Sequence, residues 1–140
     1  MESRSAISLI SKIRAKANRR IEQEMSARGI EGIATSHGDI LYALFHTPKL
    51  TMAEIAQKIG RDKSTVTALV DKLVKLGYVT KERSPEDSRV IHVTLTSKGT
   101  ELMPVFEEIS QEIIKIFYQN ITEAEKEQLV KTLEKVYNGL

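Results

Sequence analysis

Hydroxyl and amino side chains gather between Arg61 and Lys75, and these residue types are suited to phosphates and base edges. Apolar residues recur there at helical spacing. The opposite face carries small or basic residues: Lys63, Ser64, Thr67, Asp71, Lys72 and Lys75, with Thr65 and Ala68 near its boundary. Lysines attract phosphates, hydroxyls bond phosphates or base edges, and Ala or a Thr methyl group can meet a thymine methyl group. This face fits the major groove of double-stranded DNA.

The elements that would position this face have the order of a helix-turn-helix. Thr51 and Glu54 form a capping box that starts a short helix, which Gly60 ends. Asp62 is a good N-cap for the second helix, and Gly77 stands where a C-terminal glycine cap is expected. Its inward stripe is predicted to be Val66, Leu69, Leu73 and Leu76. The start of this helix should also offer free N–H groups to phosphate.

A β-hairpin is predicted directly after the second helix. Residues 78–83 read as one strand and residues 84–88 have turn composition. The second strand, 90–95, alternates and places Ile91, Val93 and Leu95 on one face. A hairpin in this position makes the unit a winged helix-turn-helix.

Further helices flank this unit on both sides. One is expected over residues 4–27, and another from an N-cap at Ser36 to just before Pro48. A long helix follows Thr96 and Ser97, with its first turns kinked or delayed by Pro104. Thr122 and Glu125 form the capping box of the final helix. The predicted fold is mainly α with a small β-hairpin wing (α+β), built from six helices.

Charge is distributed unevenly along the 140 residues, although the net charge is only +2. Residues 1–28 carry +4 and residues 61–100 carry +3, whereas residues 29–60 carry −1 and residues 101–140 carry −4. The positive charge of the middle segment coincides with the helix-turn-helix and the hairpin. A small net charge therefore hides a local basic region suited to nucleic acid.

Composition and motif searches argue against several protein classes. The chain has no cysteine, which excludes disulfides, thiolate zinc sites and catalytic thiols. His37, His46 and His92 lack metal-ligand spacing, so neither a metal nor a cofactor is expected. No phosphate loop, nucleophile elbow or H-E-x-x-H motif is present, so an enzyme is not expected. The start of the chain lacks the features of a signal peptide, and no apolar run reaches membrane length, so a cytoplasmic protein without membrane contact is expected.

Residues 50–99 resemble the MarR family of transcription regulators. Three motifs carry the resemblance: Asp62 to Thr67 leading into Leu69 to Leu73, Gly77-Tyr78-Val79 followed by Asp87-Ser88-Arg89, and Leu95 to Gly99. The resemblance implies one MarR-like chain over 1–140, with a winged DNA-binding region at 34–99 and a helical dimerisation region at 1–30 and 100–140. It further implies a homodimer on a near-palindromic operator, usually acting as a repressor.

The resemblance also assigns roles to residues. Lys63, Ser64, Thr65, Thr67 and Ala68 map onto the recognition positions, and many relatives carry arginine at the position of Ala68. Arg89 would enter the minor groove, and Asp87 would orient the wing by pairing with Arg89 or Arg83. The complete expected DNA-binding set is Arg61, Lys63, Ser64, Thr65, Thr67, Ala68, Lys72, Arg83, Asp87 and Arg89.

Two alternatives concern partners. A winged helix can serve protein contacts without any DNA role. The apolar stripes of the terminal helices can form an intramolecular core, although the small domain offers little to cover them, which favours a homodimer interface.

A small aromatic or anionic effector is a further expected partner, because the family often binds one between its two regions. His37-Gly38-Asp39 would border such a cavity.

Overall fold

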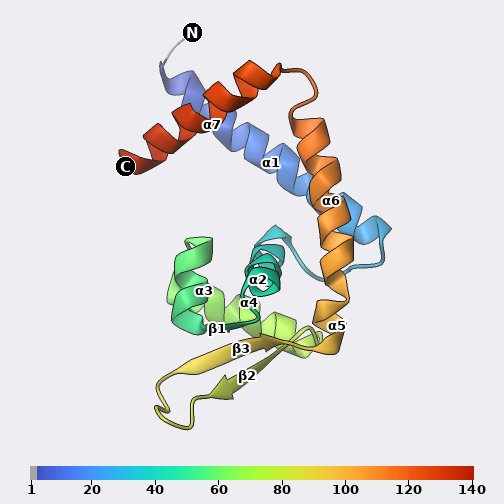
Figure 1. The fold of residues 1–140 in the computed structure, drawn as a ribbon, viewed down its shortest axis with the longest axis vertical. Coiled ribbons are helices and arrows are strands. Elements are labelled where there is room, and N and C mark those ends of the chain that lie inside the picture. Colours follow the sequence, from blue (N-terminus) through green and yellow to red (C-terminus); the bar gives the residue numbers. More distant parts are fainter. Residues whose placement is uncertain (1–2) are drawn as a thin grey trace.

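The structure is a computed structural model that describes residues 3–140 (Figure 1). The described residues form six helices of eight or more residues, one four-residue helix and a three-stranded sheet. Their order is α1 (Ser3–Ala27), α2 (Thr35–His46), β1 (Lys49–Thr51), α3 (Met52–Ile59), α4 (Lys63–Lys75), β2 (Val79–Arg83), β3 (Ile91–Leu95), α5 (Ser97–Thr100), α6 (Leu102–Phe117) and α7 (Glu123–Asn138). This confirms the predicted class.

The core lies among α2, α3, α4 and the sheet. Ile40, Leu44, Ile55 and Leu73 are each fully buried there. The sheet has the order β1-β3-β2 with both pairs antiparallel, so Val93 of the central strand faces Leu50 of β1. The sequence did not predict β1, because a three-residue strand has too little alternation to detect.

Helix α2 begins differently from the prediction. Thr35 is its first residue and Ala34 its N-cap, so Ser36 lies inside the first turn and does not cap the helix. The side chain of His37 replaces the expected cap, because its Nδ1 accepts a hydrogen bond of 2.8 Å from the N–H of Ala34. The predicted caps of α3 and α7, at Thr51 and Thr122, are present.

The inward stripe of α4 is shifted from the predicted one. Val66, Val70 and Leu73 are buried, whereas Leu69 and Leu76 are only half-buried. The difference arises because Val70 lies one turn from Val66 and faces the core of the winged region directly. Gly77 ends this segment with φ of +84°, as its predicted role as a glycine cap requires.

The first and last parts of the chain pack much more loosely than the winged region. In α1 the buried residue is Met25, near its end, and α7 has none. Large apolar side chains are exposed on both helices: Ile7, Leu9, Ile10 and Ile13 on α1, and Leu129, Val130, Leu133, Val136 and Tyr137 on α7. No helix among residues 3–140 combines the length and apolar character needed to cross a membrane.

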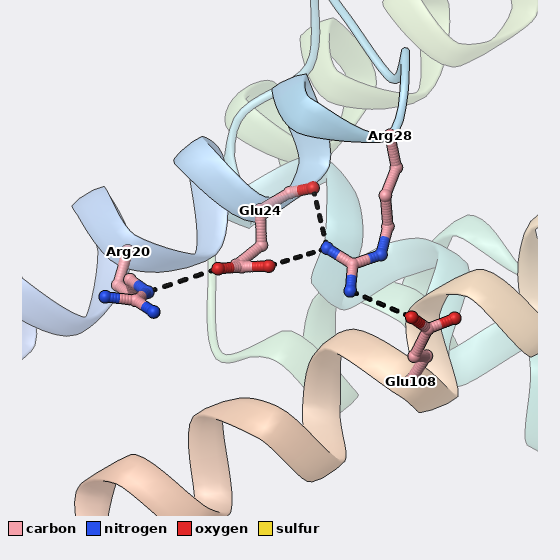
Figure 2. Close-up of polar contacts among 4 residues, drawn as sticks. All are labelled: Arg20, Glu24, Arg28 and Glu108. Atoms are coloured by element: carbon pink, nitrogen blue, oxygen red, sulfur yellow. Dashed lines mark hydrogen bonds and ion pairs between the residues drawn. The ribbon is translucent and has the colours of Figure 1, made fainter.

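Helix α6 connects the two parts of the molecule, since it runs from the sheet to α7 and lies against α1 on the way (Figure 1). Charged side chains join α1 to α6 (Figure 2). Arg28 Nη1 contacts Glu24 Oε2 at 2.6 Å and Arg28 Nη2 contacts Glu108 Oε1 at 3.0 Å, while Arg20 supports Glu24 from the other side. The hydrogen bond from Arg28 lowers the pKa of Glu24 below its ordinary value, so this group stays ionised at neutral pH.

Candidate nucleic-acid interface

The N-terminus of α4 is occupied by its own cap. Asp62 Oδ1 accepts hydrogen bonds from the N–H of Thr65 at 2.7 Å and from Ser64 Oγ at 3.0 Å. The hydrogen bonds from Thr65, chiefly from its backbone, hold the pKa of Asp62 below its ordinary value. The prediction of free N–H groups here is wrong for Thr65, because an ionised carboxylate already fills that position.

The exposed face of α4 carries most of the predicted recognition residues. Lys63, Ser64, Thr67, Ala68 and Lys72 are exposed, whereas Thr65 is half-buried. The hydroxyl of Thr67 donates to the carbonyl oxygen of Lys63 at 2.9 Å, four residues back. Two hydroxyls on this face therefore already use their hydrogen atoms within the protein.

The wing presents one arginine that is held in place by a neighbouring carboxylate. Arg89 Nε and Nη2 donate to the two carboxylate oxygens of Asp87 at 3.1 and 3.2 Å, and the N–H of Arg89 also donates to Asp87 Oδ1. The guanidinium of Arg89 lowers the pKa of Asp87 below its ordinary value. The side chain of Arg89 is nonetheless 89% exposed. It is therefore oriented and still accessible to a ligand.

Arg83 contacts the wing backbone and not the carboxylate of Asp87. Its Nη1 donates to the carbonyl oxygen of Ser88 at 2.6 Å, so it braces the wing loop from inside and does not pair with Asp87. Arg61 also points away from α4, because its Nη1 donates to Ser36 Oγ on α2 at 3.1 Å. The structure thus ties these two predicted DNA-binding residues to the fold itself.

A groove of about 230 Å³ lies between the start of α3, α4 and the wing. Its lining brings Lys63 and Thr67 together with Arg89, and adds Lys81 of β2, which was not among the predicted site residues. Lys81 Nζ contacts Asp71 Oδ1 of α4 at 2.6 Å. Helical spacing predicts that Asp71 lies on the exposed face of α4. A lysine on the strand that follows was therefore the sequence signal from which the Asp71–Lys81 ion pair could have been predicted.

A second cavity, of about 160 Å³, lies where α1, α2 and α6 meet, and it is mainly apolar. Gly38 and Asp39 of the predicted His37-Gly38-Asp39 segment line it, together with Tyr42, Phe106 and Ile109. Burial raises the pKa of Asp39, although Arg14 and Arg61 oppose this effect.

Potential metal ligands are dispersed, since no three His, Asp or Glu side chains within residues 3–140 come together as a metal site.

Comparison with known proteins places the chain among regulators. A sequence model of the MarR family matches residues 31–90. The transcriptional regulator SarZ of Staphylococcus haemolyticus is 32% identical over 100 residues, which cover 71% of this chain and 67% of that protein. The chain belongs to the MarR family. The repressor IacR of Pseudomonas putida is 29% identical over 101 residues, covering 72% of this chain and 60% of that protein.

Solved structures of MarR-family regulators have the same fold. A regulator from Methanosarcina mazei superimposes with a TM-score of 0.85 at 23% identity, covering 98% of this chain and 96% of that one. The DNA complex of MepR from S. aureus superimposes with a TM-score of 0.86 at 22% identity, covering 100% and 99%. The family consists of transcriptional regulators and not of enzymes.

Proposed function

We propose that this MarR-family protein is a ligand-responsive repressor that binds a near-palindromic operator as a homodimer in the cytoplasm. The observation that carries the DNA-binding part is the charge arrangement around α4 and the wing. Three of the five carboxylates in residues 61–100 have an internal partner: Asp62 caps α4, Asp71 pairs with Lys81, and Asp87 pairs with Arg89. Lys63 and Lys72 make no ion pair with the described residues. These pairs leave Lys63 and Lys72 as cations that the exposed face of α4 offers to DNA.

The proposed docking follows from this arrangement. Helix α4 enters the major groove while Arg89 reaches the adjacent minor groove, whose narrow A·T-rich stretches attract arginine. Two recognition helices in the dimer should lie about 34 Å apart, which is one turn of DNA. The DNA complex of MepR and the repressor name of IacR support this proposal by likeness.

The dimer and the effector rest on other parts of the molecule. The exposed apolar stripes of α1 and α7 are proposed to pack against a second copy, because nothing among residues 3–140 buries them. The apolar cavity between α1, α2 and α6 is proposed to take a small aromatic or anionic effector. An effector that binds there would change operator affinity by favouring one spacing of the two recognition helices.

The test is a gel-shift titration of the protein against the promoter next to its own gene. Arg89→Ala and Lys63→Ala should each weaken binding, and Lys115→Ala on α6 is the control that should bind like the wild type. Weak binding that neither Arg89→Ala nor Lys63→Ala changes would contradict the DNA proposal. That result would leave a winged helix used for protein contacts.

A further inference from the structure

The three exposed residues at the centre of the recognition face share one chemical property. Ser64, Thr67 and Ala68 are spaced i, i+3 and i+4, so they lie side by side on α4. Ser64 Oγ lies 3.0 Å from Asp62 Oδ1, and Thr67 Oγ1 lies 2.9 Å from the carbonyl oxygen of Lys63. A carboxylate and a carbonyl oxygen can only accept, so both hydroxyls must donate to them. Neither hydroxyl has a hydrogen atom left for DNA.

What remains on this patch is a set of acceptors and methyl groups. Each hydroxyl oxygen keeps lone pairs that can accept a hydrogen bond. Thr67 adds its methyl group and Ala68 its Cβ, and both residues are exposed. The patch therefore accepts hydrogen bonds and makes apolar contacts, but it donates no side-chain hydrogen bond.

The base pairs differ in how well they match such a patch. In the major groove adenine offers its N6 amino group as a donor, and thymine offers its 5-methyl group. A G·C pair also offers one donor, the N4 amino group of cytosine, but it has no methyl group. The methyl contacts of Thr67 and Ala68 are therefore what favours an A·T pair, because burying the thymine methyl group against them is favourable.

We propose, on the basis of the proposed DNA-binding function, that Ser64, Thr67 and Ala68 read A·T base pairs at the centre of each operator half-site. The hydroxyl oxygens accept from adenine N6, and the methyl groups of Thr67 and Ala68 contact the thymine methyl group. Lys63 and Lys72 flank this patch on the same helix and hold the phosphates.

The first experiment selects half-sites from randomised duplex DNA with the wild-type protein. The central base pairs of the selected sites are expected to be A·T. Specific sites with G·C pairs at these central positions would overturn the proposal while leaving the DNA-binding function intact. If no sequence is enriched, the proposed function itself fails.

The second experiment removes single groups from the DNA. Replacing a contacted thymine by deoxyuridine deletes only the methyl group, and affinity should fall about fourfold per contacted methyl group. Replacing a contacted adenine by purine deletes only the N6 amino group and should also weaken binding. Unchanged affinity for both substituted duplexes would overturn the proposal.

The third experiment tests the assignment to Thr67. Thr67→Val keeps the shape of the side chain but removes the acceptor, so the purine substitution should no longer weaken binding at the affected position. Thr100→Val is the matched control, because Thr100 Oγ1 makes the same hydrogen bond to the carbonyl four residues back, at 3.0 Å, on α5. The control should respond to purine like the wild type. An equal response to purine in Thr67→Val and the wild type would show that Thr67 does not read adenine.

Discussion

Several side chains of this protein have structural roles that their residue type alone does not indicate. His37 is an example, because it caps α2 through a ring nitrogen where a serine was expected. Its Nδ1 accepts from the N–H of Ala34, which requires the neutral ring. Burial, together with the nearby charge of Lys72, lowers the pKa of His37 from its ordinary value of 6.5.

The pH dependence of stability should therefore include a contribution from His37. A lowered pKa in the folded state means that unfolding takes up a proton, so stability is complete above 6.5 and declines as pH falls towards the lowered value. His37→Gln should remove this contribution, because glutamine at the same position can accept the hydrogen bond without titrating. The measurement is the urea midpoint at pH 7 and at pH 5.

His46→Gln is the control for this comparison, since His46 lies at the other end of α2 and does not cap it. It should retain the pH dependence of the wild type. An identical fall in midpoint for the wild type and His37→Gln would show that His37 does not contribute.

Gly99 is the residue on which the junction of the sheet with α5 depends. A Cβ at this position would lie 2.1 Å from the carbonyl oxygen of Tyr78, a backbone atom that cannot move aside. Gly99→Ala should therefore lower the free energy of unfolding by about 3 kcal/mol. Gly139→Ala is the control, because its nearest neighbour is 3.4 Å away and its effect should stay within about 0.5 kcal/mol. Chemical denaturation measures both, and equal stability of the two variants would contradict this account.

At the scale of elements, the wing and α4 are joined by the ion pair of Asp71 with Lys81. The pair is exposed, so its effect on stability should be small, about 0.5 kcal/mol. Its effect on DNA binding should be larger, because Lys81→Gln leaves the carboxylate of Asp71 unpaired beside the phosphates. Operator affinity should fall in Lys81→Gln and recover in the double variant Asp71→Asn, Lys81→Gln. A double variant that binds no better than Lys81→Gln would contradict the neutralising role of Lys81.

The elements also show what the sequence could predict. Helix boundaries with strong local signals, such as the capping boxes at Thr51 and Thr122, are confirmed because a cap involves residues only three apart. The strand β1 was not predicted, because its three residues form a strand only by pairing with β3, more than forty residues later in the chain. The pattern of residues 49–51 themselves contains no information about a pairing strand so far along the chain.

For the candidate site, the sequence predicted which face of α4 is exposed but not the partners of the charged residues. Periodicity placed the exposed face of α4 correctly, because the helix must bury its apolar side. The partners of the charged residues needed the fold, since Arg61 reaches α2 and Arg83 reaches the backbone of Ser88. The expected DNA-binding set, which follows the family resemblance, included both arginines, whereas the structure gives both of them internal hydrogen bonds.

At the scale of the whole molecule, α7 is the helix that the proposed dimer would affect most, because it has no buried residue. Leu133 lies in its apolar stripe and is 41% exposed. Leu133→Asp should convert a dimer into a species of the chain mass, 15.8 kDa, because a charge in an apolar interface is costly. Lys131→Asp, on the opposite face of α7, should leave the dimer intact. Light scattering over a range of concentrations measures this, and a wild-type mass of one chain at every concentration would refute the dimer.

The salt dependence of operator binding also belongs to this scale. A dimer that neutralises about eight phosphates should show a slope of about −7 for log K against log salt. Leu133→Asp should reduce the slope as well as the affinity, because each separated chain holds half of the phosphate contacts. A slope that is the same in both proteins would separate DNA binding from dimerisation.

The helix α6 also spans the distance between the winged region and α7. Its 16 residues span about 24 Å at about 1.5 Å per residue. A tilt of about 10° at the end near α7 would therefore carry the end near the sheet through about 4 Å. That displacement exceeds the spacing of successive base pairs, about 3.4 Å. A small rearrangement around α1 and α6 would thus shift the recognition helix α4 by more than one base pair along the DNA.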